Sequence, residues 1–210
     1  MESGLDKTNP KRKRSSITTK NRIFETAIQL IKTKGYPNVT VDEICEKSGV
    51  TKGAFYHHFD SKESIIDSAY IHTDSRVLEK LPQIMKNSSA LSQIIEIGFV
   101  YAELVQYKGV EIIKQIIRNN LDSVNPIHMV NNFYDLRKRP ILEIEIAILR
   151  TGQESGEIRD DITPEHIQRY IISSFNGFIL DWCYHNGSYN FVQMIQEVWP
   201  KILISYKAKE

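Results

Sequence analysis

The sequence contains little that marks a secreted, membrane-bound or metal-dependent protein. It has only two cysteines among 210 residues, and Cys45 and Cys183 lie far apart without C-x-x-C spacing, so we expect neither a disulfide framework nor a zinc site. No run approaches the roughly 20 uncharged apolar residues of a membrane span, and the first 16 residues offer no apolar segment for a signal peptide. These absences predict a cytoplasmic protein that binds no metal, no cofactor and no membrane.

The sequence also lacks the short motifs of several common enzyme classes. It has no phosphate-cradling glycine loop, no H-E-x-x-H metal motif and no G-x-S-x-G nucleophile turn. An enzymatic function would rest on scattered carboxylates alone. We therefore expect a binding protein and not an enzyme.

Charge is nearly balanced over the whole chain but not along it. The formal net charge is +1, which by itself predicts no polyanionic partner. However, residues 1–62 hold 12 Lys and Arg against 7 Asp and Glu, whereas residues 63–210 hold 15 against 19. The first part of the chain can therefore be attracted to a polyanion that the remainder repels.

Helical periodicity dominates after the first 16 residues, and no strand pattern competes with it, so we predict an all-α protein. The spacing of Ile23, Ala27 and Ile31 predicts a first helix over about 18–34, because these apolar residues share one helical face. Residues 1–16 are polar and include a K-R-K-R run. We expect them to form a flexible basic arm, either a solvated tail or a segment that contacts DNA.

Two short helices are predicted next, separated by a tight turn. Thr40 caps the first, which ends near Gly49, and Thr51 caps the second, T-K-G-A-F-Y-H-H-F. Two short helices around a glycine-containing turn are typical of a helix-turn-helix, whose second helix is free to enter a DNA groove. The second helix suits a phosphate partner, since its N-terminus and Lys52 attract anions and the small Gly53 allows close approach.

Six longer helical segments follow, with three prolines that should end, start or kink a helix. The segments are 61–81, 90–107, 109–121, 130–153, 164–185 and 189–206, and the prolines are Pro82, Pro140 and Pro200. The stretch 91–105 is apolar nearly all round, which predicts a helix that is buried on most sides.

The residues from Thr18 to about Ala69 resemble the DNA-binding domain of the TetR family of bacterial transcriptional regulators. The resemblance rests on the motifs R-I-F-x-x-A-I-x-L-I-x-x-x-G-Y, V-T-V-x-x-I-C-x-x-S-G-V-T-K-G-A-F-Y-H-H-F and S-K-E-S-I-I. It implies a three-helix DNA-binding domain over residues 17–62 and a helical ligand-binding and dimerisation domain over residues 63–210. Cys45 and Ser48 depart mildly from the family, which usually has alanine at both positions.

The resemblance also assigns DNA contacts to particular residues. Phosphate contacts would fall on Arg22, Thr40, Thr51, Tyr56, His58 and Lys62. Contacts with base edges would fall on Lys52, Gly53, Ala54 and His57. Lys62 is a cation in the first turn of a helix, where the helix dipole disfavours it, and an external phosphate would explain its position.

The second domain is rich in aromatic residues, which can pack in a core or line a cavity between helices. We expect part of a ligand pocket among Phe99, Tyr101, Phe133, Tyr134 and Phe175. The last two predicted helices offer a second apolar surface, which would form a four-helix bundle in a two-fold dimer. Its expected interface residues are Ile171, Gly177, Phe178, Trp182, Met194, Ile195, Val198, Trp199 and Ile202.

Together these features predict a homodimeric transcriptional regulator. We expect it to bind a palindromic operator in double-stranded DNA and to act as a repressor that a small-molecule effector releases. The alternative is a helical protein that binds a small molecule or a protein partner and does not read DNA. Such a protein would show no salt-dependent affinity for DNA.

Overall fold

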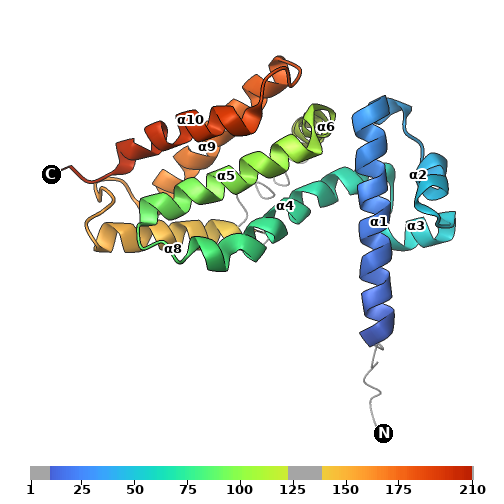
Figure 1. Ribbon diagram of the computed structural model, residues 1–210, viewed down its shortest axis with the longest axis horizontal. Coiled ribbons are helices and arrows are strands. Elements are labelled where there is room, and N and C mark those ends of the chain that lie inside the picture. Colours follow the sequence, from blue (N-terminus) through green and yellow to red (C-terminus); the bar gives the residue numbers. More distant parts are fainter. Residues whose placement is uncertain (1–9, 123–138, 210) are drawn as a thin grey trace, which may run out of the picture. The chain divides into compact units, whose positions relative to one another are not determined.

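The computed structural model describes residues 10–122 and 139–209, and the chain divides into two compact units, Met1–Asp67 and Ser68–Glu210. Helices build both units (Figure 1), and within the described ranges the only extended pairing is an isolated bridge between Ile158 and Lys207. The all-α prediction is therefore confirmed. None of the helices in these ranges is long and apolar enough to cross a membrane.

The first unit contains three helices around a small apolar core, followed by the start of a fourth. These elements are α1 (Pro10–Lys34), the 3-10 helix η1 (Tyr36–Asn38), α2 (Val41–Ser48), α3 (Lys52–His58) and the beginning of α4 (Lys62–Ile84). The predicted face of α1 is buried, since Ile23, Ala27 and Ile31 are fully inaccessible to solvent, and Ile44 of α2 and Phe55 of α3 join them in this core.

Helix α1 begins earlier than the sequence indicated. It starts at Pro10 and not near residue 18, so residues 10–16, which we expected in the flexible arm, are helical. Proline suits the first turn because the N–H that it lacks has no partner there, and lysine and arginine have good helix propensity. Residues 1–9 of the predicted arm lie outside the described residues.

Within the described residues, the second unit contains the rest of α4 and five further α-helices. They are α5 (Ala90–Lys108), α6 (Val110–Asp122), α8 (Pro140–Glu154), α9 (Pro164–Tyr184) and α10 (Phe191–Leu203), followed by the 3-10 helix η2 (Ile204–Tyr206). Pro140 starts α8 as predicted, whereas Pro82 and Pro200 lie in the last turns of α4 and α10. The part of the predicted segment 130–153 that precedes Arg139 lies outside the described residues.

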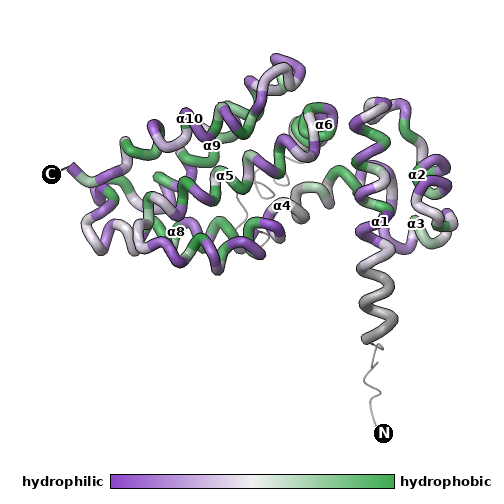
Figure 2. The backbone as a smooth tube through the Cα atoms, viewed as in Figure 1, coloured by the Kyte–Doolittle hydropathy of each residue, from purple (hydrophilic) through white to green (hydrophobic). Residues whose placement is uncertain are grey.

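Helix α5 lies in the middle of the second unit, with α10 packed on one side and α8 on the other (Figure 1). Its hydrophobic residues recur along the helix (Figure 2), and the side chains of Leu91, Ile94, Ile97 and Val100 are buried. The prediction of a helix buried on most sides is therefore confirmed. Helix α10 approaches closely at Gly98, where an added Cβ atom would lie 2.2 Å from Nε1 of Trp199.

Candidate functional site

The turn between α2 and α3 has the geometry of a helix-turn-helix. The hydroxyl of Thr40 accepts a hydrogen bond from the N–H of Glu43 at 3.2 Å, and the hydroxyl of Thr51 accepts one from the N–H of Ala54 at 3.1 Å. Gly49 ends α2 with a φ of 64°, a left-handed conformation that glycine adopts without strain. Both predicted caps and the predicted glycine turn are thus present.

Helix α3 is anchored by one face and open on the other. Phe55 is fully buried and Phe59 nearly so, with their rings 5.9 Å apart. The side chains of Lys52, Tyr56 and His57 are exposed, as is Thr51 at the cap. The arrangement holds the helix rigidly while it presents polar and cationic groups to a partner.

The remaining predicted contact residues on α1, α2 and α3 differ in their accessibility. Arg22, Thr40 and Gly53 are exposed, whereas Ala54 and His58 are half-buried. A Cβ atom added at Gly53 would meet nothing closer than 3.9 Å, so packing within the protein does not require glycine there. Partial burial, helped by the neighbouring His57 and Lys20, lowers the pKa of His58, so its imidazole is neutral at pH 7 and acts as a hydrogen-bonding group and not as a cation.

The sequence suggested that Lys62 would contact an external phosphate, but in the structure its ammonium is hydrogen-bonded within the protein. Its ammonium donates hydrogen bonds to the carbonyl oxygens of Tyr36 at 2.9 Å and Val39 at 2.8 Å, and it lies 4.1 Å from the centre of the Tyr36 ring. Backbone carbonyls at the start of η1 and just after it thus bind the cation and explain its place in the first turn of α4. The Tyr36 hydroxyl also donates to Glu63 at 2.9 Å, which fixes the same corner.

Lys52 is paired within the protein as well. Its ammonium lies 2.7 Å from a carboxylate oxygen of Asp42 on α2, and both side chains remain more than half exposed. The hydrogen bond to Asp42 raises the pKa of Lys52, so the ammonium is fully charged at neutral pH. The sequence predicted the lysine but not this acidic partner.

The two departures from the family pattern fit the packing of α2. Cys45 and Ser48 are both buried, and the Ser48 hydroxyl donates to the carbonyl oxygen of Ile44 at 2.6 Å. Burial raises the pKa of the Cys45 thiol, so this cysteine is a small packing residue. Among the residues that the structure describes, no cluster of His, Cys, Asp and Glu could hold a metal ion.

The predicted pocket residues of the second unit fall into three groups. Tyr101 and Phe175 lie together, with ring centres 6.3 Å apart, and Phe175 also packs against Trp199 at 5.1 Å. Phe99 is half-buried. Phe133 and Tyr134 lie outside the described residues.

A buried polar cluster adjoins these aromatic rings. Asp74 of α4 binds Arg139 through two hydrogen bonds of 2.7 and 2.8 Å and accepts a third from the Tyr101 hydroxyl at 2.7 Å. Burial raises the pKa of Tyr101 well above its usual range. Nearby, Glu145 accepts a hydrogen bond from Gln168 at 3.1 Å, and burial raises the pKa of Glu145 to about 7. We refer to Asp74, Tyr101, Arg139, Glu145 and Gln168 as the interior polar cluster.

The predicted dimer surface separates into buried and accessible residues. Four of the predicted residues belong to the core of the protomer and cannot face a partner; they are Ile171, Trp182, Ile195 and Trp199. Their burial follows from the amphipathic character of α9 and α10, which both turn one apolar side inward. Val198 is half-buried.

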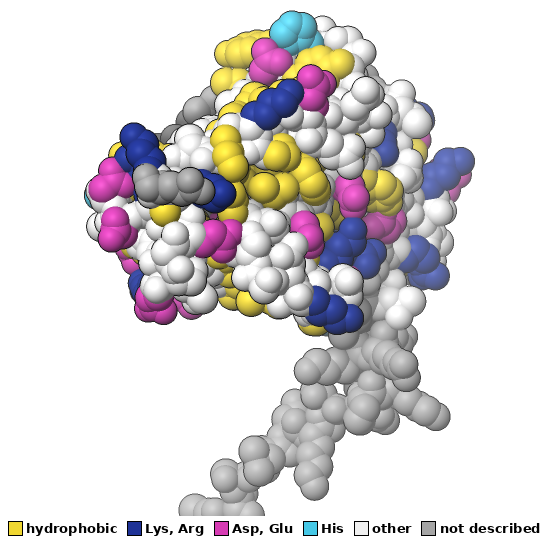
Figure 3. All heavy atoms as spheres, turned by 60° about the vertical axis from the view of Figure 1, so that its left-hand side comes forward, with side chains coloured by type: hydrophobic (Ala, Val, Ile, Leu, Met, Phe, Trp, Pro, Cys, Tyr) yellow, Lys and Arg dark blue, Asp and Glu magenta, His cyan; other side chains and the backbone are white. Residues whose placement is uncertain are grey.

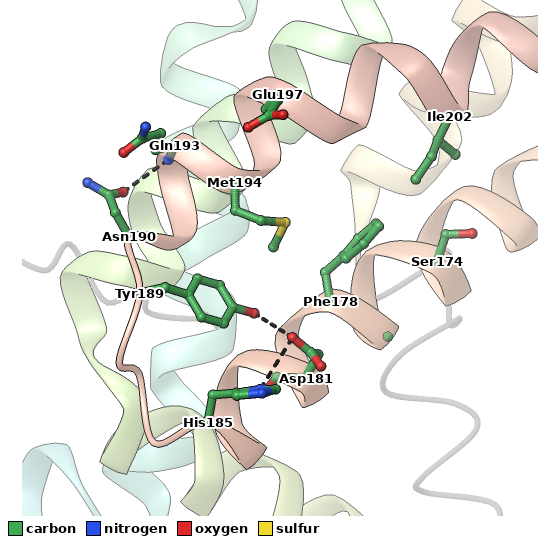
Figure 4. Close-up of a pocket in the computed structure, with 11 residues that line it drawn as sticks. Ser174, Phe178, Asp181, His185, Tyr189, Asn190, Gln193, Met194, Glu197 and Ile202 are labelled. Atoms are coloured by element: carbon green, nitrogen blue, oxygen red, sulfur yellow. Dashed lines mark hydrogen bonds and ion pairs between the residues drawn. The ribbon is translucent and has the colours of Figure 1, made fainter.

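The other predicted interface residues line an open groove between α9 and α10. The groove has a volume of about 870 Å³, and Gly177, Phe178, Met194 and Ile202 lie in it. Figure 4 shows Phe178 and Met194 pointing toward each other across the groove, with Asp181, His185 and Tyr189 at one end. On the face of the second unit in Figure 3, hydrophobic side chains gather in a patch bordered by charged ones.

Comparison with known proteins identifies the first unit. Residues 23–69 match the family model described as bacterial regulatory proteins of the tetR family. The match spans the end of α1, both helices of the helix-turn-helix and the start of α4. Residues 23–69 therefore carry the helix-turn-helix domain of the tetR family.

Similarity to individual TetR-family proteins extends over most of the chain. The A-factor receptor protein of Streptomyces griseus is 26% identical over 192 residues, which cover 90% of this chain but only 64% of that relative. The chain thus spans less than two thirds of the length of this relative. The fatty acid degradation regulator FadR of Bacillus halodurans superposes with a TM-score of 0.70 at 18% identity, covering 95% of this chain and 97% of that one. FadR of Bacillus subtilis, solved in complex with stearoyl-CoA, superposes with a TM-score of 0.67 at 21% identity, covering 88% and 97%.

Two features of the second unit could not be predicted, or were not predicted, from the sequence. The interior polar cluster joins residues that are 27 and 65 positions apart, such as Tyr101 and Arg139 with Asp74, and no local pattern announces such contacts. On α9, Leu180 and Tyr184 are exposed, Tyr184 by 76%. Residues four positions apart lie on the same face of a helix, so the sequence could have predicted an exposed apolar face at Leu180 and Tyr184.

Proposed function

We propose that the chain is a transcriptional repressor that binds duplex DNA through α3 and is released by a small molecule bound in the unit Ser68–Glu210. The observation that carries the proposal is the helix-turn-helix, in which buried Phe55 anchors α3 and leaves Lys52, Tyr56 and His57 exposed. A helix of this size, held by one face, fits the major groove. Such a regulator acts in the bacterial cytoplasm, where the DNA lies.

The predicted contact residues divide into two kinds. Thr51, with the N-terminus of α3, and the side chains of Arg22, Thr40, Tyr56 and His58 would donate hydrogen bonds to phosphates and fix the register of the protein on DNA. Lys52 and His57 would reach base edges, and the small Gly53 and Ala54 would let the helix backbone approach them. The absence of a packing reason for Gly53 within the protein supports close approach by a partner.

A homodimer would place two recognition helices on one operator. The groove between α9 and α10 presents Phe178, Met194 and Ile202 to solvent, and the same groove on a second copy offers a matching apolar surface. A Cβ atom at Gly177 would meet nothing within 4 Å in the protomer, which leaves room for a partner helix. Two-fold pairing predicts a palindromic operator with half-sites about 34 Å apart.

The interior polar cluster, with Phe175 packed beside its Tyr101, supports an effector site in the second unit. Buried charged groups are unfavourable unless they are paired, and an interior that combines them with aromatic rings can bind a ligand with polar and apolar parts. The related FadR of Bacillus subtilis is described with stearoyl-CoA, a ligand with an acyl chain. Asp74 belongs to α4, which starts in the first unit. A ligand that favours a displaced α4 would therefore shift the protein away from its DNA-binding state.

Selection of bound duplexes from a random DNA pool tests the proposal. We expect a palindromic sequence whose affinity for the full chain falls steeply as salt rises, because each neutralised phosphate adds about 0.9 to the log–log slope. Release of this duplex by stearoyl-CoA would support an acyl-CoA effector, and unchanged affinity at saturating stearoyl-CoA would contradict it. Failure to enrich any sequence, with no salt-dependent binding, would overturn the proposed function in favour of a helical protein that does not read DNA.

A further inference from the structure

The ion pair between Asp42 and Lys52 connects the two helices of the helix-turn-helix by their side chains. Asp42 is in the first turn of α2, and Lys52 is the first residue of α3. The ammonium and carboxylate are 2.7 Å apart, with 62% of the Lys52 side chain and 68% of the Asp42 side chain exposed. Water therefore surrounds both charges, and a DNA phosphate or base could reach either of them.

The pair controls the charge of the recognition helix. Within the seven residues of α3, all of which the structure describes, Lys52 is the single lysine or arginine and no acidic residue is present. In the DNA-free protein, Asp42 therefore balances the one fixed positive charge that α3 can present. Asp42 would also repel phosphates that approach this end of α3.

An exposed ion pair of this kind is weak enough for DNA to compete with it. Pairs on protein surfaces typically change an equilibrium constant by only about 1.4- to 5-fold. Random DNA offers Lys52 mainly phosphate oxygens, whereas a cognate site also offers paired acceptors on a guanine edge. The Asp42 carboxylate beside Lys52 therefore weakens binding to the phosphates of random DNA. It can also orient the Lys52 ammonium toward a guanine edge.

We propose that Asp42 is a positioning residue that holds Lys52 for base contact and restrains its use as a general phosphate-binding cation, so that it increases the discrimination between operator and random DNA. The inference rests on the proposed function, and it concerns a residue outside the predicted contact set. Specificity for the operator then arises partly because the Asp42 carboxylate repels the phosphates of random DNA.

The test compares Asp42→Asn with Glu46→Gln in the full chain. Glu46 lies one turn further along α2 and is exposed, and among the described contacts of this unit it has no ion pair with α3. Both variants remove one negative charge from the same helix, but only Asp42→Asn frees Lys52. Thermal melts followed by circular dichroism check that both variants fold.

Affinity is measured for two duplexes of equal length and composition, the sequence recovered by selection and a shuffled version of it. We expect Asp42→Asn to bind the shuffled duplex about two- to fivefold more tightly, with a salt slope steeper by about 0.9, and the ratio of selected to shuffled affinity to fall at least twofold. Glu46→Gln should leave this ratio unchanged. Equal ratios for Asp42→Asn and the wild-type protein, or equal shifts in both variants, would overturn the inference.

A double-mutant cycle shows whether Asp42 acts through Lys52. In a Lys52→Ala background, Asp42→Asn should no longer change the affinity ratio, and a persistent change would contradict the positioning role. The outcomes also distinguish failure of the Asp42 role from failure of the proposed DNA-binding function. Wild-type protein that binds the selected duplex while the cycle shows no coupling would overturn this inference alone, whereas wild-type protein without DNA binding would overturn the proposed function together with it.

Discussion

Two ion pairs of equal length occupy opposite environments in this protein. Asp42 and Lys52 in the first unit are 2.7 Å apart, and so are Asp74 and Arg139 in the second. The first pair is more than 60% exposed at both side chains, whereas the side chains of the second are only 8% and 9% exposed. Arg139 also donates to the Tyr101 hydroxyl at 3.0 Å, so the buried pair belongs to a network.

The contrast shows that burial, and not distance, decides what an ion pair does. Water screens the exposed pair, which can open at little cost and so can take part in binding. The buried pair has lost its hydration, and removal of one partner would leave an uncompensated charge in the interior. The exposed pair therefore suits the proposed role in DNA recognition, whereas the buried pair holds α4 to the start of α8 within the proposed effector site.

Breaking the buried pair should produce the largest effect. Arg139→Met leaves the Asp74 carboxylate buried without its cation, and we expect the free energy of unfolding of the second unit to fall by about 3–5 kcal/mol. Urea denaturation of the full chain measures the loss. The double variant Asp74→Asn with Arg139→Met removes both charges and should recover a large part of it. A loss below about 1 kcal/mol in the single variant would show that the pair is not structural.

The protonation of Glu145 should produce the next largest effect. Its pKa is about 7 in the folded protein against an ordinary value of 4.5, so the folded state binds the proton more tightly than the unfolded state. The stabilisation is complete below about pH 4.5 and is lost as the pH rises through about 7, by an amount of the order of 3 kcal/mol. Unfolding free energies measured across this range should fall less in Glu145→Gln than in the wild-type protein. Identical pH profiles would contradict the burial of an ionisable Glu145.

Lys62 lies between the exposed and the buried ion pair in its solvent exposure. Its removal should therefore have an intermediate effect on stability. Lys62→Ala removes two hydrogen bonds to the carbonyl oxygens of Tyr36 and Val39, and we expect the first unit to lose about 1–2 kcal/mol. Lys47→Ala, which removes an exposed lysine from α2, is the matched control and should change stability by less than about 0.5 kcal/mol. If Lys62→Ala unfolds at the same urea concentration as the wild-type protein yet binds DNA more weakly, Lys62 contacts a DNA phosphate and does not stabilise the first unit.

Breaking the exposed pair should have the smallest effect on stability. Lys52→Ala should leave the urea midpoint of unfolding nearly unchanged while it weakens binding to the selected duplex. Lys201→Ala removes an exposed lysine from α10 and serves as a control for charge in the binding assay. Loss of stability comparable to that of Arg139→Met would remove the distinction between the two pairs.

The sequence predicted those parts of the molecule that depend on local signals. The caps at Thr40 and Thr51 and the turn at Gly49 are read from residues within one helical turn, and all three are present. The all-round apolar pattern of α5 likewise predicted a central helix. The start of α1 was predicted too late because a polar, basic stretch has good helix propensity even without an apolar face.

The sequence could not reveal features that depend on distant contacts. Lys62 binds carbonyls that lie 23 and 26 residues away, so its dipole-opposed position suggested an external phosphate instead. On α10 the apolar residues surround more than one face, and the pattern alone did not separate the buried Ile195 and Trp199 from Met194 in the groove. Burial had to come from the structure, because it depends on which neighbouring helix covers each face.

Footprinting of the selected duplex by hydroxyl radicals, with guanine methylation protection in parallel, tests DNA recognition by α3 most directly. For the wild-type protein we predict two protected segments about 34 Å apart, each with protected guanines in the major groove. Lys52→Ala should lose protection at one or more of these guanines while the backbone footprint keeps its position. Uniform protection along the duplex, or guanines whose protection does not depend on Lys52, would contradict sequence reading by this helix.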